Sequence, residues 1–155
     1  GTVLGEAQHE MRSYVHGMRT REYEQTSLAV LVTREVTRLK ENQHYDVHLD
    51  IAPSRFSVEP KTQLCSIVKE ALNNIRKHSG ADFVEISLQP RCENWVLAIT
   101  DNGIGFDPTS TLEFNRSASG LSIMAERAHL LGGELQIDSC TSKTVIRVEF
   151  PQKGD

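Results

Sequence analysis

The sequence predicts an α+β fold, a two-layer α/β sandwich in which a mixed sheet carries helices on one face. Two patterns predict this class. Some segments repeat apolar residues every three or four positions, as helices packed on one side do. Others are short and alternate apolar with polar residues, as strands do. Both kinds interleave along 155 residues, a length that suits one domain with a buried core.

Local signals place the helices at residues 6–21, 27–40, 60–79 and 120–131. Ser27 precedes a clear apolar stripe and is a favoured N-terminal capping residue. Pro60 suits the first turn of the third helix. We expect this helix to end at Gly80, because glycine tolerates the left-handed conformation of a helix end. The fourth helix ends at Gly132 and Gly133.

The strands are expected at residues 47–51, 83–88, 95–100, 134–139 and 144–150. Residues 89–94 are interpreted as the turn between the second and third strands. Residues 101–119 combine Gly, Pro, Ser, Thr and Asn with little periodicity. This indicates one long loop, and long loops in compact domains are commonly functional.

The composition narrows the setting of the protein. A formal net charge of −4 argues against non-specific nucleic-acid binding, which usually needs a basic face. No apolar run reaches membrane-spanning length, and the first residues lack the pattern of a signal peptide. The three cysteines lack metal or redox spacing, which favours reduced thiols in a cytoplasmic protein. The missing initiator Met suggests a fragment whose longer parent can carry membrane segments upstream.

Polar residues line one face of the third helix near its end. Glu70, Asn74 and Lys77 share this face on a 3.6-residue repeat, and the side chain of His78 lies at its edge. A carboxylate that accepts a proton, an amide oxygen for Mg²⁺ and a cation for phosphate together suit a nucleoside triphosphate. The alternative is an ordinary solvated helix face, because charged surface stripes are common.

A glycine-containing turn, residues 101–105, directly follows a predicted strand. Gly103 and Gly105 let the backbone approach a ligand closely, and Asp101 can accept a hydrogen bond from an exocyclic amine. The alternative is a simple Asp-Asn-Gly turn. The third glycine of the dinucleotide fingerprint is missing, and the chain has no Walker sequence.

Gly120 lies at the expected junction between the long loop and the fourth helix. Free backbone N–H groups at a helix N-terminus attract anions, so the junction is a candidate phosphate site. By itself it can equally be a plain helix start. The order and spacing of the three features carry more information than any one of them.

The three segments resemble the N, G1 and G2 boxes of the GHKL ATPases, at residues 70–78, 101–105 and 120–121. Within that superfamily, residues 72–79 and 120–128 are similar to the nitrate-sensor-like branch of two-component sensor histidine kinases. The resemblance covers about residues 6–151 and implies a Bergerat-type ATP-binding fold.

The resemblance implies roles at the phosphate end of an ATP site. Glu70 would polarise the attacking nucleophile as general base, and Asn74 would hold Mg²⁺ through its side-chain oxygen. The remaining residues assigned to the phosphates are Lys77, His78, Gly120 and Leu121.

The resemblance also implies roles at the end of the ATP site that binds adenine. Asp101 would recognise the adenine amine, while Gly103 and Gly105 shape the pocket around the base. Thr144 matches a threonine that lines this pocket from a late strand. Residues 106–119 would form a lid that closes over the phosphates.

The activity implied by the resemblance is transfer of the ATP γ-phosphoryl group to a histidine outside this fragment. Residues 1–24 would be the end of a dimerisation helix and a linker, and residues 25–152 the ATP-binding domain. The expected partners are ATP, the phosphoacceptor hairpin of the same protein and a response regulator. The fragment would be monomeric and its parent a homodimer. His9 and His16 are interpreted as solvated helix residues.

Two departures from the family pattern keep other functions open. Ala118 stands where a glycine is usual, and residues 141–143 replace glycines ahead of the late-strand threonine. A regulatory pseudokinase that binds nucleotide without transfer is one alternative. Another GHKL member, such as an anti-sigma serine kinase or a simple ATPase, is the other.

Overall fold

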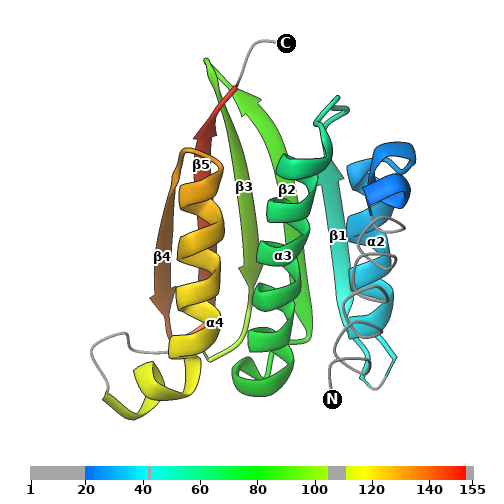
Figure 1. Ribbon diagram of the computed structural model, residues 1–155. Helices are drawn as coiled ribbons and strands as arrows, with labels where there is room; N and C mark the ends of the chain where they lie inside the picture. Colours follow the sequence, from blue (N-terminus) through cyan, green and yellow to red (C-terminus); the bar gives the residue numbers. More distant parts are fainter. Residues whose placement is uncertain (1–19, 42, 105–110, 153–155) are drawn as a thin grey trace, which may run out of the picture.

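A mixed sheet and a layer of helices make up the part of the chain that the computed structural model describes, residues 20–41, 43–104 and 111–152 (Figure 1). The strands are β1 (Asp46–Ile51), β2 (Phe83–Arg91), β3 (Asn94–Asp101), β4 (Glu134–Cys140) and β5 (Lys143–Pro151). Their spatial order is β1-β2-β3-β5-β4. β1 runs parallel to β2 and every other pair is antiparallel, so the predicted mixed sheet is confirmed.

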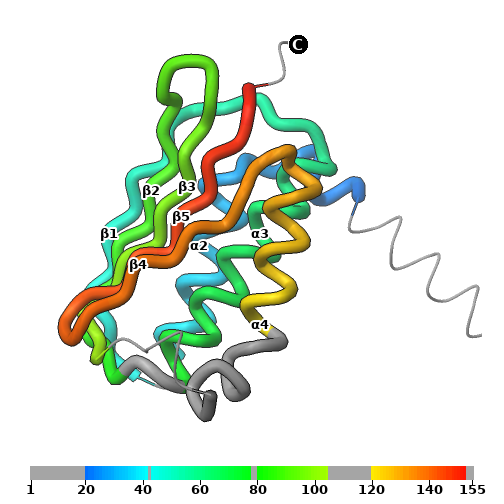
Figure 2. Tube along the Cα trace, turned by 90° about the vertical axis from the view of Figure 1, so that its left-hand side faces the viewer, coloured from blue at the N-terminus to red at the C-terminus, as the bar shows by residue number. Residues whose placement is uncertain are grey.

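The helices are α2 (Leu28–Leu39), α3 (Val58–Asn74) and α4 (Thr111–Leu130), and a π-helical turn, Ile75–Ser79, extends α3. Figure 2 shows the sheet on one side and these helices on the other, as predicted. Residues 20–25 are also helical. Although α4 has 20 residues, no helix within the described ranges has the length and apolar character that a membrane crossing requires.

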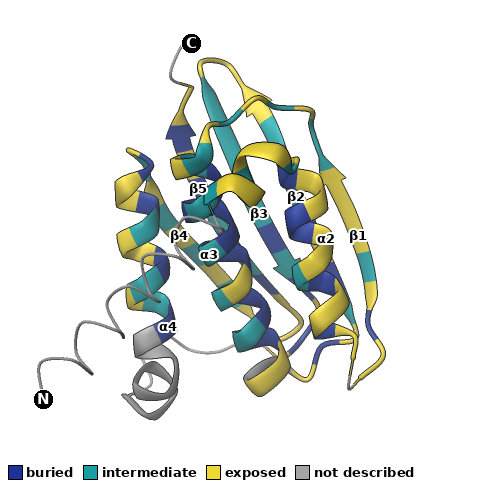
Figure 3. Cartoon of the chain, turned by 45° about the vertical axis from the view of Figure 1, so that its right-hand side comes forward, coloured by how far each residue is buried: buried dark blue, intermediate teal, exposed yellow. Residues whose placement is uncertain are grey.

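The core lies between the two layers. Every second residue of the inner strands is buried, for example Ile86 in β2, Ile99 in β3 and Val148 in β5. The helices turn their buried sides toward the sheet and their exposed sides outward (Figure 3). Ile67 and Val68 of α3 are fully buried in this way. The apolar periodicity of the sequence therefore identified the correct faces.

Several helix ends were predicted correctly. Ser27 caps α2, since its side chain accepts a hydrogen bond from the Val30 N–H at 3.4 Å. Gly80 ends the helical segment after α3 in the left-handed conformation, with φ of 65°. Gly132 has φ of 82°, and the Gly133 N–H donates to the Ala128 carbonyl at 3.0 Å, which closes the end of α4.

The predicted turn at residues 89–94 was too long. β2 and β3 continue toward each other, with Pro90 opposite Trp95 and Arg91 opposite Asn94, so only residues 92 and 93 form the turn. Cys92 adopts φ of 56°, the left-handed conformation that such a tight connection requires. Pro90 thus lies in β2, close to the hairpin turn.

The long loop predicted for residues 101–119 was also too long, because α4 begins at Thr111. The expected lid, residues 106–119, is therefore helical from residue 111 onward, and residues 105–110 lie outside the described ranges. Serine, threonine and asparagine suggested a loop. Intrinsic propensity is a weak signal, and the intervening leucine, glutamate, arginine and alanine are good helix formers.

Alkylation of the native protein at neutral pH is expected to modify Cys92 and Cys140 and to spare Cys65. The first two are exposed and the third is buried. Burial raises the pKa of the Cys65 thiol to about 12, with a further increase from Glu35 and a decrease from Lys61. Because the thiolate is the nucleophile, Cys65 should react only after unfolding. Mass spectrometry with and without denaturant measures this, and equal native labelling of all three cysteines would contradict it.

Candidate functional site

Most of the predicted site residues lie at one end of the sandwich. α3 ends, β3 ends and α4 begins at the lower end of the molecule in Figure 1. The turn between β4 and β5 lies at the same end. Parts of the sequence that are far apart are thereby brought to one region, namely residues 70–77, 101–104, 120–121 and 144.

Asp101 is a buried carboxylate at the end of β3. It lies two residues after Ile99, so both side chains point to the face of the sheet that carries the helices. Only 4% of Asp101 is exposed, and one carboxylate oxygen accepts a hydrogen bond from the Gly103 N–H at 2.8 Å. Burial raises the pKa of Asp101 above its ordinary value, and the bond from Gly103 opposes this increase.

Asn102 holds the turn that follows Asp101, a role that the sequence analysis missed. Its side-chain oxygen accepts hydrogen bonds from the N–H groups of Asp82 at 3.1 Å and Phe83 at 3.0 Å. Its amide nitrogen donates to the Asp82 carboxylate at 2.7 Å. The turn is thus fastened to the start of β2. Asparagine side chains commonly hydrogen-bond to the backbone in turns, and this preference could have indicated the role of Asn102 from the sequence.

Thr144 lies directly opposite Asp101 in the β3–β5 pair, as the assignment of both to one pocket requires. It is 5% exposed and its hydroxyl forms a 2.9 Å hydrogen bond with that of Ser139 on β4. Ser139 was not predicted from the sequence. Because side chains on opposite residues of paired strands share a face, Thr144 and Asp101 point to the same side of the sheet.

Gly120 lies against the polar face of α3. A Cβ atom added at Gly120 would lie 3.3 Å from Asn74 Oδ1 and 3.5 Å from Glu70 Oε2. The Glu70 carboxylate and the Asn74 amide, which were predicted to share one face, therefore lie beside Gly120, the glycine predicted at the phosphate end of the site. Leu121, the next residue, is partly buried and packs against the core.

Two features of the phosphate end differ from the prediction. Gly120 lies inside α4, so the expected anion site at a helix N-terminus does not exist there. The regular 3.6-residue repeat of α3 also ends at Asn74, where the π turn begins. Lys77 lies in this wider π turn and is exposed. The side chain of His78 and all of Gly105 lie outside the described part.

The donor set fits a metal-bound polyphosphate. Asn74 and Glu70 offer hard oxygen atoms of the kind that Mg²⁺ prefers, and Mg²⁺ in such sites takes further ligands from phosphate and water. The described residues contain no group of three or more His, Cys, Asp or Glu side chains that could hold a metal ion. At the end of β3, the buried carboxylate of Asp101 offers a hydrogen-bond acceptor to a polar edge of a ligand.

Comparisons with known proteins agree with this arrangement. The family model described as "Histidine kinase-, DNA gyrase B-, and HSP90-like ATPase" matches residues 59–154. The sensor histidine kinase LiaS of Bacillus subtilis is 33% identical over 99% of this chain and 43% of its own length. The oxygen sensor histidine kinase NreB of Staphylococcus carnosus is 35% identical over 70% of this chain and 31% of its own length. The chain thus spans less than half the length of either relative.

A solved structure shows the same fold. The histidine kinase domain from the Erythrobacter litoralis EL346 blue-light activated histidine kinase superposes with a TM-score of 0.71. The match covers 83% of this chain and 62% of that chain at 18% sequence identity. At this identity the likeness concerns the fold, and it confirms the predicted α+β sandwich.

Proposed function

This chain belongs to the histidine kinase-, DNA gyrase B- and HSP90-like family of ATPases, and we propose that it transfers the γ-phosphoryl group of ATP to a histidine outside the chain. The proposal places it in the nitrate-sensor-like branch of two-component sensors. One observation carries it: Gly120 lies against Glu70 and Asn74 at the end of the sandwich where Asp101 lies opposite Thr144. Relatives named as sensor histidine kinases support the phosphotransfer.

The adenine end is built on Asp101. Its carboxylate accepts a hydrogen bond from the exocyclic amine of adenine, and burial keeps competing water away. Gly103, also buried, leaves room for the base, and Gly105 is assigned the same role by resemblance. Thr144 lines the pocket from β5. Asn102 keeps the whole turn in place through its bonds to the start of β2.

The phosphate end is built on α3 and α4. Asn74 would hold Mg²⁺, which supplies positive charge that neutralises the phosphate oxygens. Gly120 presents backbone without a side chain beside Asn74, and Leu121 follows it. Lys77 and His78 are assigned to the phosphates by resemblance. The π turn that carries them is a type of element frequently found at functional sites.

Transfer would proceed without a covalent intermediate on this domain. The bond between the γ-phosphorus and its bridging oxygen breaks, a bond to an imidazole nitrogen forms, and ADP leaves. Glu70 accepts the proton that the imidazole loses. The imidazole belongs to the dimerisation hairpin of a homodimeric parent, from which a response regulator receives the group. We assign residues 1–24 to the hairpin's end and linker, a cytoplasmic location to the domain, and a monomeric state to the fragment.

Trans-phosphorylation tests this function. The chain is incubated with γ-labelled Mg-ATP and a separately produced dimerisation hairpin of its parent. We expect acid-labile, alkali-stable label on a hairpin histidine and none on this chain. Nucleotide binding without phosphohistidine would identify a pseudokinase. Label on a serine of an added partner would identify a kinase of the anti-sigma type.

Gly120→Ala is expected to weaken Mg-nucleotide binding by about tenfold, which corresponds to about 1.4 kcal/mol. The added Cβ would crowd the Asn74 side chain at 3.3 Å. Stability should change little, because the preference for alanine over glycine inside a helix, about 1 kcal/mol, offsets the crowding of Asn74. Calorimetric titration and a thermal melt measure the two effects. Ser122→Ala, an exposed change on the same helix, is the control. Unchanged affinity in Gly120→Ala would exclude this glycine from the site.

A further inference from the structure

Lys61, in the first turn of α3, is a buried lysine that bonds to a distant part of the chain. It is 8% exposed, and its ammonium group donates to the carbonyl oxygens of Tyr23 at 2.7 Å and Thr26 at 3.0 Å. No salt bridge to a carboxylate is found for it within the described ranges. A buried charge is costly unless it is hydrogen-bonded, so these two carbonyls are its main compensation.

The two carbonyls lie where the helical residues 20–25 end. The last carbonyls of a helix have no partner inside the helix and carry partial negative charge. A lysine ammonium therefore both satisfies them and interacts favourably with the helix dipole. Lys61 thus caps residues 20–26, which we call the leading segment, and fastens it to α3.

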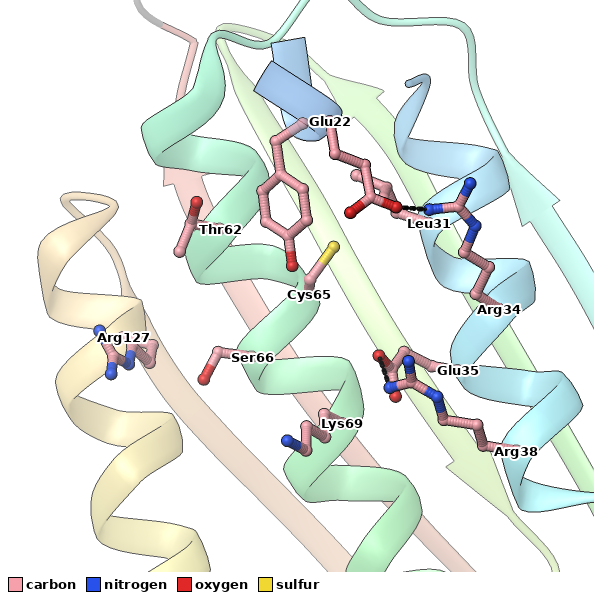
Figure 4. Close-up of a pocket in the computed structure, with 11 residues that line it drawn as sticks. Glu22, Leu31, Arg34, Glu35, Arg38, Thr62, Cys65, Ser66, Lys69 and Arg127 are labelled. Carbon is pink, nitrogen blue, oxygen red and sulfur yellow. Dashed lines mark hydrogen bonds and ion pairs between the residues drawn. The ribbon is translucent and has the colours of Figure 1, made fainter. Parts of the chain in front are cut away.

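Among the other contacts of the leading segment, two are of a different kind. Tyr23 packs against the hydrophobic core. Glu22 forms an ion pair with Arg34 of α2, and Figure 4 shows this pair among the residues that line a pocket between the leading segment, α2 and α3. Both side chains of that pair are 48% exposed, and such pairs contribute little to stability. The bonds from Lys61, in contrast, are a buried polar connection between the leading segment and α3.

α3 joins this connection to the candidate site. Lys61 lies in the first turn of the helix and Asn74 is its last residue, about 20 Å apart at 1.5 Å per residue. Lys61 therefore cannot touch a nucleotide held at Asn74. The helix is continuous between them, so the direction in which the leading segment meets α3 is fixed relative to Glu70 and Asn74.

We propose that Lys61 is a positioning residue for phosphoryl transfer: it holds the leading segment on α3 and so sets the orientation of the ATP site toward the histidine-bearing part of the protein. The inference rests on the proposed function. Reaction rates depend steeply on the alignment of the reacting groups, so a loosened connection should slow transfer and leave nucleotide binding intact.

Lys61→Met in the full-length parent tests the proposal, because it keeps an apolar stem and removes the donors. We expect the autophosphorylation rate at saturating ATP to fall by about tenfold to a hundredfold, with the KM for ATP changed less than about twofold. Amide hydrogen exchange should increase in residues 20–27. Lys61→Arg, which can still donate to both carbonyls, should restore most of the rate, and Glu22→Gln should change little.

The outcomes separate the two proposals. A wild-type protein that binds ATP but never forms phosphohistidine overturns the proposed function, and the positioning role with it. A working wild type whose transfer rate and hydrogen exchange are unaffected by Lys61→Met overturns the positioning role alone. Loss of nucleotide binding in both Lys61→Met and Lys61→Arg also overturns it, since the lysine would then support the fold of the ATP site itself.

Discussion

Replacement of Asp101 by asparagine is expected to abolish the stabilisation of this protein by Mg-ATP and Mg-ADP. The carboxylate is a pure acceptor, whereas an amide that turns its NH₂ group toward adenine presents donor to donor. Losing a hydrogen bond to a buried charged group costs about 1.5–3 kcal/mol, and the unpaired amine adds to that, so affinity should fall about a hundredfold or more. A thermal melt with and without nucleotide measures the effect.

The same variant without nucleotide should melt above the wild type at neutral pH. Burial raises the pKa of Asp101 in the folded state, so the folded state holds its proton to higher pH than the unfolded state does. The favourable contribution of the protonated group is therefore complete below the unfolded pKa of about 4 and is lost as pH rises through the folded pKa. Asparagine does not ionise, so the variant avoids this loss of stability at neutral pH.

Two comparisons make the Asp101→Asn result decisive. Asp138→Asn removes an exposed carboxylate from β4 and should keep the nucleotide-dependent shift of the wild type. In the wild type, nucleotide affinity should fall as pH drops through the raised pKa of Asp101, because the protonated carboxyl no longer acts only as an acceptor. A full shift in Asp101→Asn, equal to that of Asp138→Asn, would remove Asp101 from the adenine site.

Gly133→Ala is expected to lower the free energy of unfolding by about 3 kcal/mol, the upper part of the usual range for overpacking. An added Cβ would lie 2.1 Å from the Glu149 carbonyl oxygen and 3.0 Å from the Phe150 Cβ. β5 is paired on both sides, with β3 and β4, so its backbone cannot move away without disturbing two ladders. The Gly133 N–H also closes the end of α4 through Ala128.

Urea unfolding of Gly133→Ala beside Gly80→Ala isolates the steric effect. Gly80 has φ of 65°, and a Cβ there would meet nothing within 4 Å, so only the left-handed conformation is penalised, by about 1–2 kcal/mol. We expect Gly133→Ala to be the less stable of the two. If it were the more stable, the close approach of Gly133 to β5 would not restrict the side chain as the structure indicates.

Much of the fold was predictable because burial leaves a periodic record in the sequence. The stripe of α2, its cap at Ser27 and the alternation in β5 are local patterns, and each predicted its element closely. The family of the chain was predictable for a related reason. The spacing of residues around Glu70, Asp101 and Gly120 is written along the chain, and it survives whatever the exact ends of the helices are.

The sequence by itself determined the two-layer α+β class, the buried faces and the residues that carry the ATP-site motifs. Only the tertiary structure decided that α4 begins at Thr111, that a π turn follows Asn74, and that Asn102 and Lys61 bond to distant backbone. The physical reason is the range of the interactions. Periodicity reports which side of an element faces the core, whereas these features depend on partners that folding brings from elsewhere in the chain.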